Sequence, residues 1–115
     1  MYKVEDLLIW KKSIVLAKEV YALSTKISND ERFGIISQIK RSAVSIPSNI
    51  AEGAGRNSNK EFKHFSGIAN GSCYELQTQL ILLKELNLIN ESETTPLIDQ
   101  CIEIQKMIYS FKLKI

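Results

Sequence analysis

The sequence predicts an all-α protein that folds as an antiparallel, up-and-down four-helix bundle, with one domain over residues 1–115. Apolar residues recur every three or four positions along four long segments, the spacing that places side chains on one face of a helix. No segment keeps the period-two alternation typical of strands, and the chain has only 5 Gly and 2 Pro. Four amphipathic helices joined by short links bury their apolar faces most simply against one another.

The first helix is expected near residues 5–26, where one face carries Leu7, Trp10, Ile14, Ala17 and Tyr21. The second is expected near residues 30–54, with a face formed by Ile36, Ile39, Ala43, Ile46 and Ile50. Ser28 and Glu31 have the spacing of a capping box, in which the serine oxygen accepts from the third amide of the helix. Gly53 and Gly55 suit the left-handed turn that ends many helices.

Pro47 lies well inside the second helix, where proline removes one backbone hydrogen bond and crowds the carbonyl of Ala43. Two interpretations are open: a continuous helix that is kinked at Pro47, or a break after which Ser45 caps a new helix. The apolar spacing of Ala43, Ile46 and Ile50 stays in phase through the proline and favours the kinked helix.

The third helix is expected near residues 59–86, after a second capping box formed by Ser58 and Glu61. Its apolar face carries Phe62, Phe65, Ala69, Leu76, Leu80 and Leu83. The fourth is expected near residues 94–112, with Pro96 in its first turn, where proline is tolerated. Its face carries Leu97, Cys101, Ile104, Ile108 and Phe111.

The chain has more apolar side chains than four core-facing stripes require. The runs Leu7-Leu8-Ile9-Trp10 and Leu80-Ile81-Leu82-Leu83 are apolar around a whole helical turn, and the fourth helix adds Ile98, Ile102 and Met107. A helix that is apolar all round is normally buried all round, so a second copy of the chain is expected to cover the excess. The alternative is ordinary scattered exposure of apolar side chains.

Composition excludes several classes of protein. No stretch approaches the ~18 apolar residues of a membrane span, so no membrane role is expected. The formal net charge of +2 does not by itself indicate a nucleic-acid partner. Cys73 and Cys101 are far apart, and the first residues lack the pattern of a secretory signal, which favours a reduced, cytoplasmic protein.

No residue pattern indicates catalysis, and we expect no enzyme, cofactor or metal. His64 is the chain's single histidine and follows Glu61 at the spacing used in di-iron bundles, but such a site needs two of these units and two further carboxylates. Glu52 and Glu75 form a conceivable acid–base pair, but each has neighbours, such as Arg41 or Arg56, able to neutralise it. The cysteines lie on apolar faces and are expected to be buried.

Basic side chains gather in the middle of the chain, with seven Lys or Arg and three acidic residues between Arg32 and Lys84. We expect phosphate binding there, through Lys40, Arg41, Arg56, Lys60 and Lys63. Residues 85–103 hold five acidic residues and no basic one. The alternative for the basic residues is a solvated rim with no ligand.

One polar run is distinctive, and its residues carry a resemblance to a known family. It spans Ser45-Ile46-Pro47-Ser48-Asn49-Ile50-Ala51-Glu52-Gly53, with Gln38-Ile39-Lys40-Arg41 before it and Arg56 after it. Matching positions elsewhere are Asp6-Leu7, Trp10-Lys11, Lys60-Glu61-Phe62, Phe65, Ala69, Gly71-Ser72, Glu75-Leu76 and Gln79-Leu80. The chain thereby resembles the bacterial 23S rRNA intervening-sequence protein family, also called the four-helix-bundle protein family, over nearly its whole length.

The resemblance implies an up-and-down bundle that assembles as a ring-like homopentamer, without accepted catalytic residues. Some members of the family are encoded inside intervening sequences of large-subunit rRNA genes, and a related fold is an accessory subunit of reverse transcriptase in diversity-generating retroelements. The polar run would then have a mainly structural role. Its side chains would form contacts across a subunit boundary or satisfy backbone groups freed by the proline. The residues concerned are Ser45, Pro47, Ser48, Asn49 and Glu52.

The sequence therefore predicts a non-enzymatic, homo-oligomeric scaffold that binds RNA or a nucleic-acid-handling partner. The alternative is a protein–protein interaction module with no nucleic-acid role.

Overall fold

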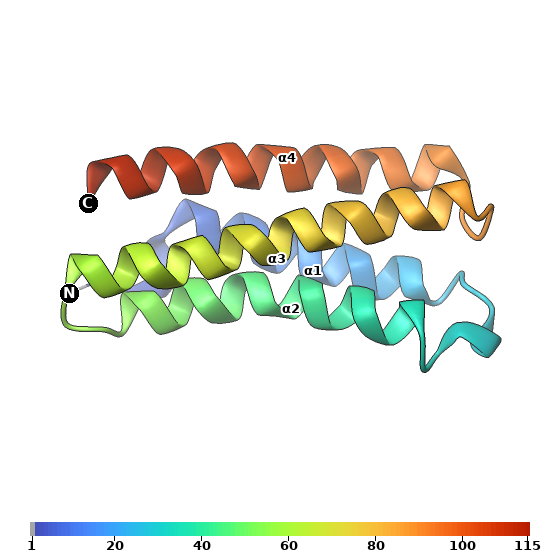
Figure 1. The fold of residues 1–115 in the computed structure, drawn as a ribbon, viewed down its shortest axis with the longest axis horizontal. Coiled ribbons are helices and arrows are strands. Elements are labelled where there is room, and N and C mark those ends of the chain that lie inside the picture. The colour runs from blue at the N-terminus through green and yellow to red at the C-terminus, as the bar shows by residue number, and fades with distance from the viewer. Residues whose placement is uncertain (1) are drawn as a thin grey trace.

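The computed structural model describes residues 2–115, so only Met1 of the predicted domain lies outside it. Within these residues the chain forms four α-helices and no strand, which confirms the all-α class. The helices are α1 (Leu8–Ser24), α2 (Ile35–Ala54), α3 (Asn59–Glu85) and α4 (Glu91–Lys114), with short 3-10 turns η1 (Val4–Asp6) and η2 (Asn29–Glu31). They run up and down with their axes nearly aligned (Figure 1).

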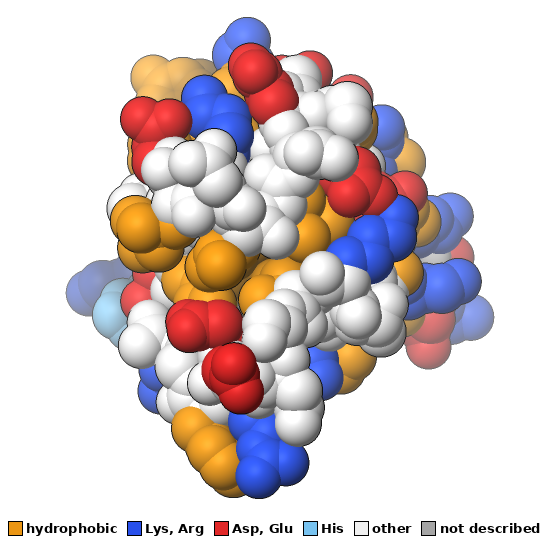
Figure 2. Space-filling model, turned by 90° about the vertical axis from the view of Figure 1, so that its right-hand side faces the viewer, with side chains coloured by type: hydrophobic (Ala, Val, Ile, Leu, Met, Phe, Trp, Pro, Cys, Tyr) orange, Lys and Arg blue, Asp and Glu red, His pale blue; other side chains and the backbone are white. Residues whose placement is uncertain are grey.

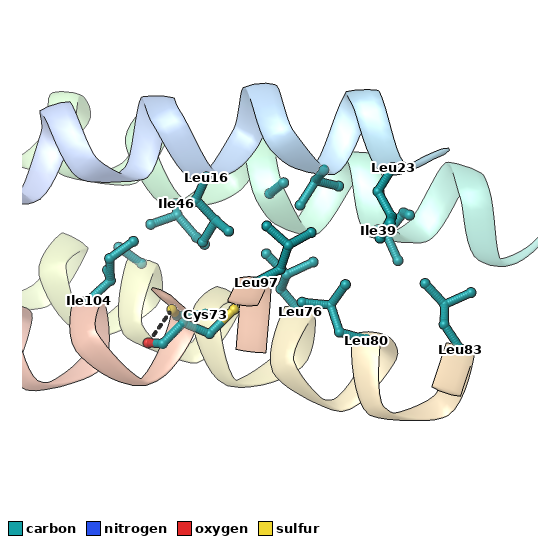
Figure 3. Packing of buried hydrophobic residues seen from close by; sticks show 14 of the residues in the cluster. Leu16, Leu23, Ile39, Ile46, Cys73, Leu76, Leu80, Leu83, Leu97 and Ile104 are labelled. Atoms are coloured by element: carbon teal, nitrogen blue, oxygen red, sulfur yellow. Dashed lines mark hydrogen bonds between the residues drawn. The ribbon is translucent and has the colours of Figure 1, made fainter. Parts of the chain in front are cut away.

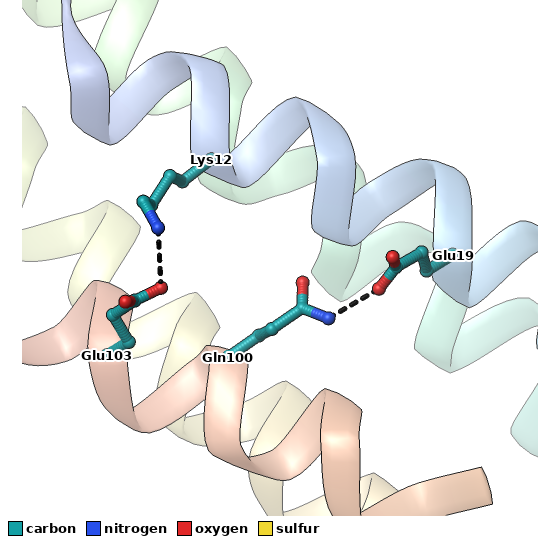
Figure 4. Close-up of polar contacts among 4 residues, drawn as sticks. All are labelled: Lys12, Glu19, Gln100 and Glu103. Carbon is teal, nitrogen blue, oxygen red and sulfur yellow. Dashed lines mark hydrogen bonds and ion pairs between the residues drawn. The ribbon is translucent and has the colours of Figure 1, made fainter.

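The bundle is a rod that measures 43 × 23 × 19 Å. Each helix packs on its neighbours in the chain, and α4 returns to contact α1, which closes the bundle. Polar side chains bridge the α1–α4 seam on its outer side: Lys12 pairs with Glu103 at 3.0 Å, and Glu19 accepts a hydrogen bond from Gln100 (Figure 4). Short connections and a closed ring of helices place the two chain ends at the same end of the rod (Figure 1).

The core runs along the whole rod and is built from aliphatic side chains of all four helices (Figure 3). All five apolar residues predicted for the face of the second helix are buried, and the predicted face of the third is buried apart from Phe65. Phe65 is half-buried, and its Cβ lies beside Gly53 on the α2 side of α3. These two helices therefore present the faces that the spacing indicates.

The predicted face of the first helix is wrong. Tyr21 is exposed, Leu7 and Trp10 are only half-buried, and the buried side chains of α1 are Ile9, Ser13, Leu16, Val20, Leu23 and Ser24. Ser13 interrupts the true apolar stripe, which is why the neighbouring stripe looked more continuous. Its hydroxyl donates to the carbonyl of Trp10 at 2.8 Å, so the polar group is satisfied within the helix and can be buried.

Three helix starts also differ from the prediction. The first helix begins at Leu8 instead of residue 5, after the separate turn η1. The second helix begins at Ile35 instead of residue 30, because Ser28 accepts from the amide of Asp30 and forms the separate turn η2. Gly34 then precedes α2 with φ −108° and ψ −111°, which is not helical. The fourth helix begins three residues early, at Glu91, so Pro96 lies in its second turn instead of its first.

The start of the third helix confirms the predicted serine cap. Ser58 accepts from the amide of Glu61 at 3.1 Å, and its hydroxyl donates to the Glu61 carboxylate at 3.4 Å. At Pro47 the structure excludes a break, since α2 is continuous from Ile35 to Ala54 and the proline is buried. A bend at Pro47 stays a prediction.

The glycines at the end of α2 do not form the predicted left-handed turn. Within residues 2–115 no glycine has a positive φ, and Asn87, after α3, is the residue that adopts one (57°). Gly53 lies inside the helix for a different reason: a Cβ there would be 2.7 Å from Cδ1 of Phe62 and 3.0 Å from Cβ of Phe65. The absence of a side chain at Gly53 lets α3 pack closely against α2.

We expect Gly53→Ala to destabilise the protein even though alanine is the better helix former. The added methyl group collides with a buried ring, and overpacking costs more than the roughly 1 kcal/mol that helix propensity contributes, for a net loss of about 1–2 kcal/mol. Urea denaturation followed by circular dichroism measures the change. Gly55→Ala is the matched control: its Cβ meets only helix carbonyls at 3.6 and 3.7 Å, so its stability should change little. Equal urea midpoints for the two variants would contradict the close packing of α3 against Gly53.

Candidate nucleic-acid interface

Three of the predicted phosphate-binding residues lie close together and are exposed. Arg56 lies in the turn between α2 and α3, and Lys60 and Lys63 lie in the first turns of α3. Arg56 and Lys60 line a groove of about 470 Å³ together with Glu61, His64 and Phe65. The serine cap at the start of α3 fixes where this helix begins, and hence which side chains its first turns present beside the turn.

Arg56 is held in place by two neighbours. Its guanidinium pairs with Glu52 one turn earlier at 3.3 Å, and its Cζ lies 4.8 Å from the centre of the Phe65 ring. His64 meets the same ring edge-on, with centroids 5.3 Å apart. The exposed ion pair contributes little stability, but together with the ring it orients the guanidinium over the groove.

Lys112 joins these residues from α4, 49 or more positions away in the chain. A Cβ added to Gly67 would lie 3.5 Å from the Lys112 ammonium, so this side chain crosses α3 one turn beyond Lys63. We call Arg56, Lys60, Lys63 and Lys112 the basic end. The four positive charges face two nearby carboxylates, Glu52 and Glu61, so positive charge is in excess.

Sequence reasoning missed Lys112 as part of this cluster. The signal was present, because Lys106, Lys112 and Lys114 close the chain without an acidic residue among them. The antiparallel order of the helices could have placed the end of α4 beside the start of α3, but the helical register that brings Lys112 to Gly67 depends on side-chain packing.

The opposite end of the rod has no excess of positive charge among the described residues. It carries the α1–α2 and α3–α4 connections, and Figure 2 shows acidic and basic side chains interspersed there among neutral ones. Lys26 pairs with Glu93 at this end, and Asp30, Glu31 and Glu91 lie on the same connections or helix starts. Positive charge is therefore concentrated at one end of the bundle.

Lys40 and Arg41, also predicted to bind phosphate, lie elsewhere. They line a separate groove of about 470 Å³ with Tyr21 and Val44, and the Lys40 ammonium is 5.0 Å from the Tyr21 ring centre. Arg41 and Arg56 are separated by roughly 20 Å along the helix axis, at about 1.5 Å per residue. The five predicted residues thus form two groups, and the nucleic-acid role of both stays a prediction.

The predicted structural motif joins α2 to α3 within one chain. The hydroxyls of Ser45 and Ser72 are 2.8 Å apart, and the Asn49 amide donates to the carbonyl of Ser45 at 2.8 Å. Asn49 therefore does not serve the Ala43 carbonyl that Pro47 leaves without its helical donor. Ser48 and Glu52 stay exposed, and contact of the motif with another subunit stays a prediction.

The residues considered for catalysis are separated or occupied. Glu52 pairs with Arg56, whereas Glu75 accepts from Ser42 at 2.9 Å. The Cys73 thiol donates to the carbonyl of Cys101 at 3.2 Å (Figure 3). A side-chain hydrogen bond between the two cysteines, followed by burial, raises the pKa of the Cys101 thiol, so this thiol stays protonated and a poor nucleophile. Among residues 2–115, no cluster of three His, Cys, Asp or Glu side chains is suited to a metal ion.

Part of the predicted apolar surplus lies on the surface, whereas Ile98, Ile102 and Met107 of the fourth helix are half-buried. Leu8 is 58% exposed, and Ile81 and Leu82 are 38% and 44% exposed. Near the N-terminal end of α1, an apolar groove of about 350 Å³ runs against α4 and is lined by Leu7, Leu8, Ile9, Met107 and Phe111, with Lys106, Ser110 and Lys114 beside them. Along the described part of the chain, no helix has both the length and the apolar character required to cross a bilayer.

Comparisons with known proteins place the chain in a family. No protein with a curated description matches it. A crystal structure of a protein of unknown function from the S23 ribosomal protein family of Bacteroides thetaiotaomicron is similar, with a TM-score of 0.85 and 26% sequence identity over 91% of this chain and 98% of that one. The sequence model for the 23S rRNA-intervening sequence protein matches residues 5–110. The chain therefore belongs to the 23S rRNA-intervening sequence protein family.

Proposed function

We propose that this protein is a non-enzymatic, homo-oligomeric helical scaffold of the cytoplasm that binds RNA through its basic end. The convergence of Arg56, Lys60, Lys63 and Lys112 from a turn and two helices supports the proposal most directly. Lysine and arginine side chains that neutralise phosphates supply most of the affinity in sequence-independent nucleic-acid binding. Neither the matching family nor the similar protein from Bacteroides thetaiotaomicron is described with an enzymatic activity.

Self-association is part of the proposal. The exposed side chains of Leu8, Ile81 and Leu82 supply apolar surface that a second copy can cover. In a ring of copies, of which a pentamer is the expected form, each subunit would contribute its own basic end. RNA that reaches several subunits would then bind far more tightly than RNA held by one.

Filter binding of the purified protein to a structured RNA tests the electrostatic mechanism. Three lysines that each neutralise one phosphate should make the affinity fall about 20- to 40-fold when the salt concentration rises about fourfold. A larger drop is expected if several subunits contact one RNA molecule. Absence of binding at low salt, or affinity that does not change with salt, would contradict the proposal.

A second candidate function is supported by the apolar groove between α1 and α4. This groove suits an amphipathic helix from another protein. The apolar face of the helix would pack on Leu7, Leu8 and Phe111, and acidic residues beside that face would pair with Lys106 and Lys114. A protein-interaction module of this kind would be indifferent to charge reversal at the basic end, whereas RNA binding would not. The same variants therefore separate the two functions.

A further inference from the structure

We propose that the groove lined by Arg56, Phe65 and His64 holds an unpaired nucleobase, so that the protein selects single-stranded over double-stranded nucleic acid. The inference rests on the proposed RNA binding at the basic end and adds what is recognised there. The groove has a volume of about 470 Å³, within the range of roughly 300–1,000 Å³ that small-ligand pockets occupy.

Three planar groups meet at this groove. The Arg56 guanidinium lies over the Phe65 ring at 4.8 Å, and the His64 ring meets Phe65 at 5.3 Å and 76°. Unpaired bases stack on aromatic rings and on guanidinium planes, and this contact tolerates any base because every base has a flat face. A base in a duplex is already stacked on both faces and cannot use such a surface without being extruded.

The aromatic surface is held in position by the close packing of α3 on α2. Phe65 is half-buried, and its Cβ lies 3.0 Å from where a Cβ on Gly53 would be, so its position on the α2–α3 seam is tightly constrained. Arg56 is constrained by Glu52 at 3.3 Å. A ligand ring therefore meets groups that are already placed, which reduces the entropy lost on binding.

The charged residues around the groove can contact different parts of a nucleotide. Glu52 offsets the charge of Arg56, which leaves the guanidinium as a stacking surface more than as a phosphate ligand. Lys60 borders the groove, Lys63 follows it on α3, and the Lys112 ammonium reaches α3 at Gly67 from α4. These side chains can meet successive phosphates of an extended strand. Glu61 also lines the groove, and its carboxylate can accept from the exocyclic amino group of a base.

Fluorescence anisotropy with two labelled oligonucleotides tests the proposal. One is a single-stranded RNA, and the other has the same phosphate backbone with abasic sites, so that the two carry equal charge. We expect the abasic strand to bind about tenfold more weakly, the loss typical of one base–aromatic stack, with a similar dependence on salt. A duplex of equal length should also bind more weakly than the single strand.

Variants assign the effect to the groove. Phe65→Leu should remove most of the difference between the normal and abasic strands. Phe33→Leu is the matched control, because Phe33 is also covered by an arginine, Arg32 at 4.6 Å, but lies on the α1–α2 connection at the other end of the rod. Since Phe65 is half-buried, Arg56→Lys provides a second variant that keeps the charge and removes the plane; it should also reduce the difference.

The outcomes distinguish this proposal from the one on which it rests. Salt-dependent binding of equal strength to normal and abasic strands would refute the base site and leave the basic end as an RNA-binding surface. Equal loss of discrimination in Phe33→Leu and Phe65→Leu would also refute it. Absence of salt-dependent binding to any of the oligonucleotides would refute RNA binding itself.

Discussion

Replacing Phe62 with alanine is expected to lower the free energy of unfolding by about 3–5 kcal/mol, a large part of the stability of a domain this size. The Phe62 side chain is 1% exposed, and its ring packs edge-on against Tyr2 and Phe111, each with centroids 4.9 Å apart. The ring therefore ties the first turn of α3 to the N-terminal segment and to the last turns of α4. Its removal leaves a cavity that these elements can fill only by moving.

Urea denaturation at a fixed protein concentration measures this loss, since association would otherwise shift the apparent stability. Phe33→Ala serves as the control, because Phe33 is 87% exposed and its truncation should change stability by no more than about 0.5 kcal/mol. The packing described at this end of the bundle would be contradicted if the two variants unfolded at the same urea concentration.

Charge reversal at the basic end should nearly abolish RNA binding. Replacing the three lysines Lys60, Lys63 and Lys112 with glutamate removes three phosphate contacts, which alone amounts to about 100-fold in affinity at about 0.1 M salt. Repulsion from the new carboxylates adds to this loss. Stability should change little at Lys60 and Lys63, which are exposed, and more at Lys112, which is half-buried.

A control with the same change in net charge keeps this experiment specific. Charge reversal at sites outside the basic end serves this purpose, with the substitutions Lys18→Glu, Arg32→Glu and Lys84→Glu. This variant should retain most of the affinity of the unchanged protein. If both triple variants lose binding equally, the affinity follows overall charge and the basic end has no special role.

The helices could be predicted from sequence because periodic apolar residues and capping residues are local signals. Ser58 marked the start of α3 correctly, since its contact with the Glu61 amide lies within a single turn. The same pattern at Ser28 gave the wrong start for α2. The Ser28 hydroxyl accepts from the nearer amide of Asp30 in a 3-10 turn, and the exposed Phe33 and Gly34 separate this turn from the helix. The buried face of α1 was missed because Ser13 satisfies its hydroxyl within the helix, which polarity alone does not reveal.

Only part of the candidate site could be predicted from the sequence. The sequence shows which charged residues are neighbours in the chain, whereas the site combines residues that are distant in the chain. Arg56, Lys60 and Lys63 were found together because they lie within two turns of one another. Lys40 and Arg41 were grouped with them although the length of α2 separates the two sets. Lys112 was left out because its position depends on how α4 packs against Gly67. The orientation of Arg56 over Phe65 likewise follows from the turn between α2 and α3 and from no local pattern.

The uneven distribution of charge along the 43 Å rod has a consequence for how the molecule approaches a ligand. Lysines near the start of α3 and the end of α4 lie at one end, while Glu91 and Glu93 begin α4 at the other. The separation gives the molecule an electric dipole along its length, and the field of a polyanion exerts a torque on a dipole. The rod would turn before contact and arrive end-on, which raises the fraction of productive collisions and directs the exposed Phe33 away from the bound strand.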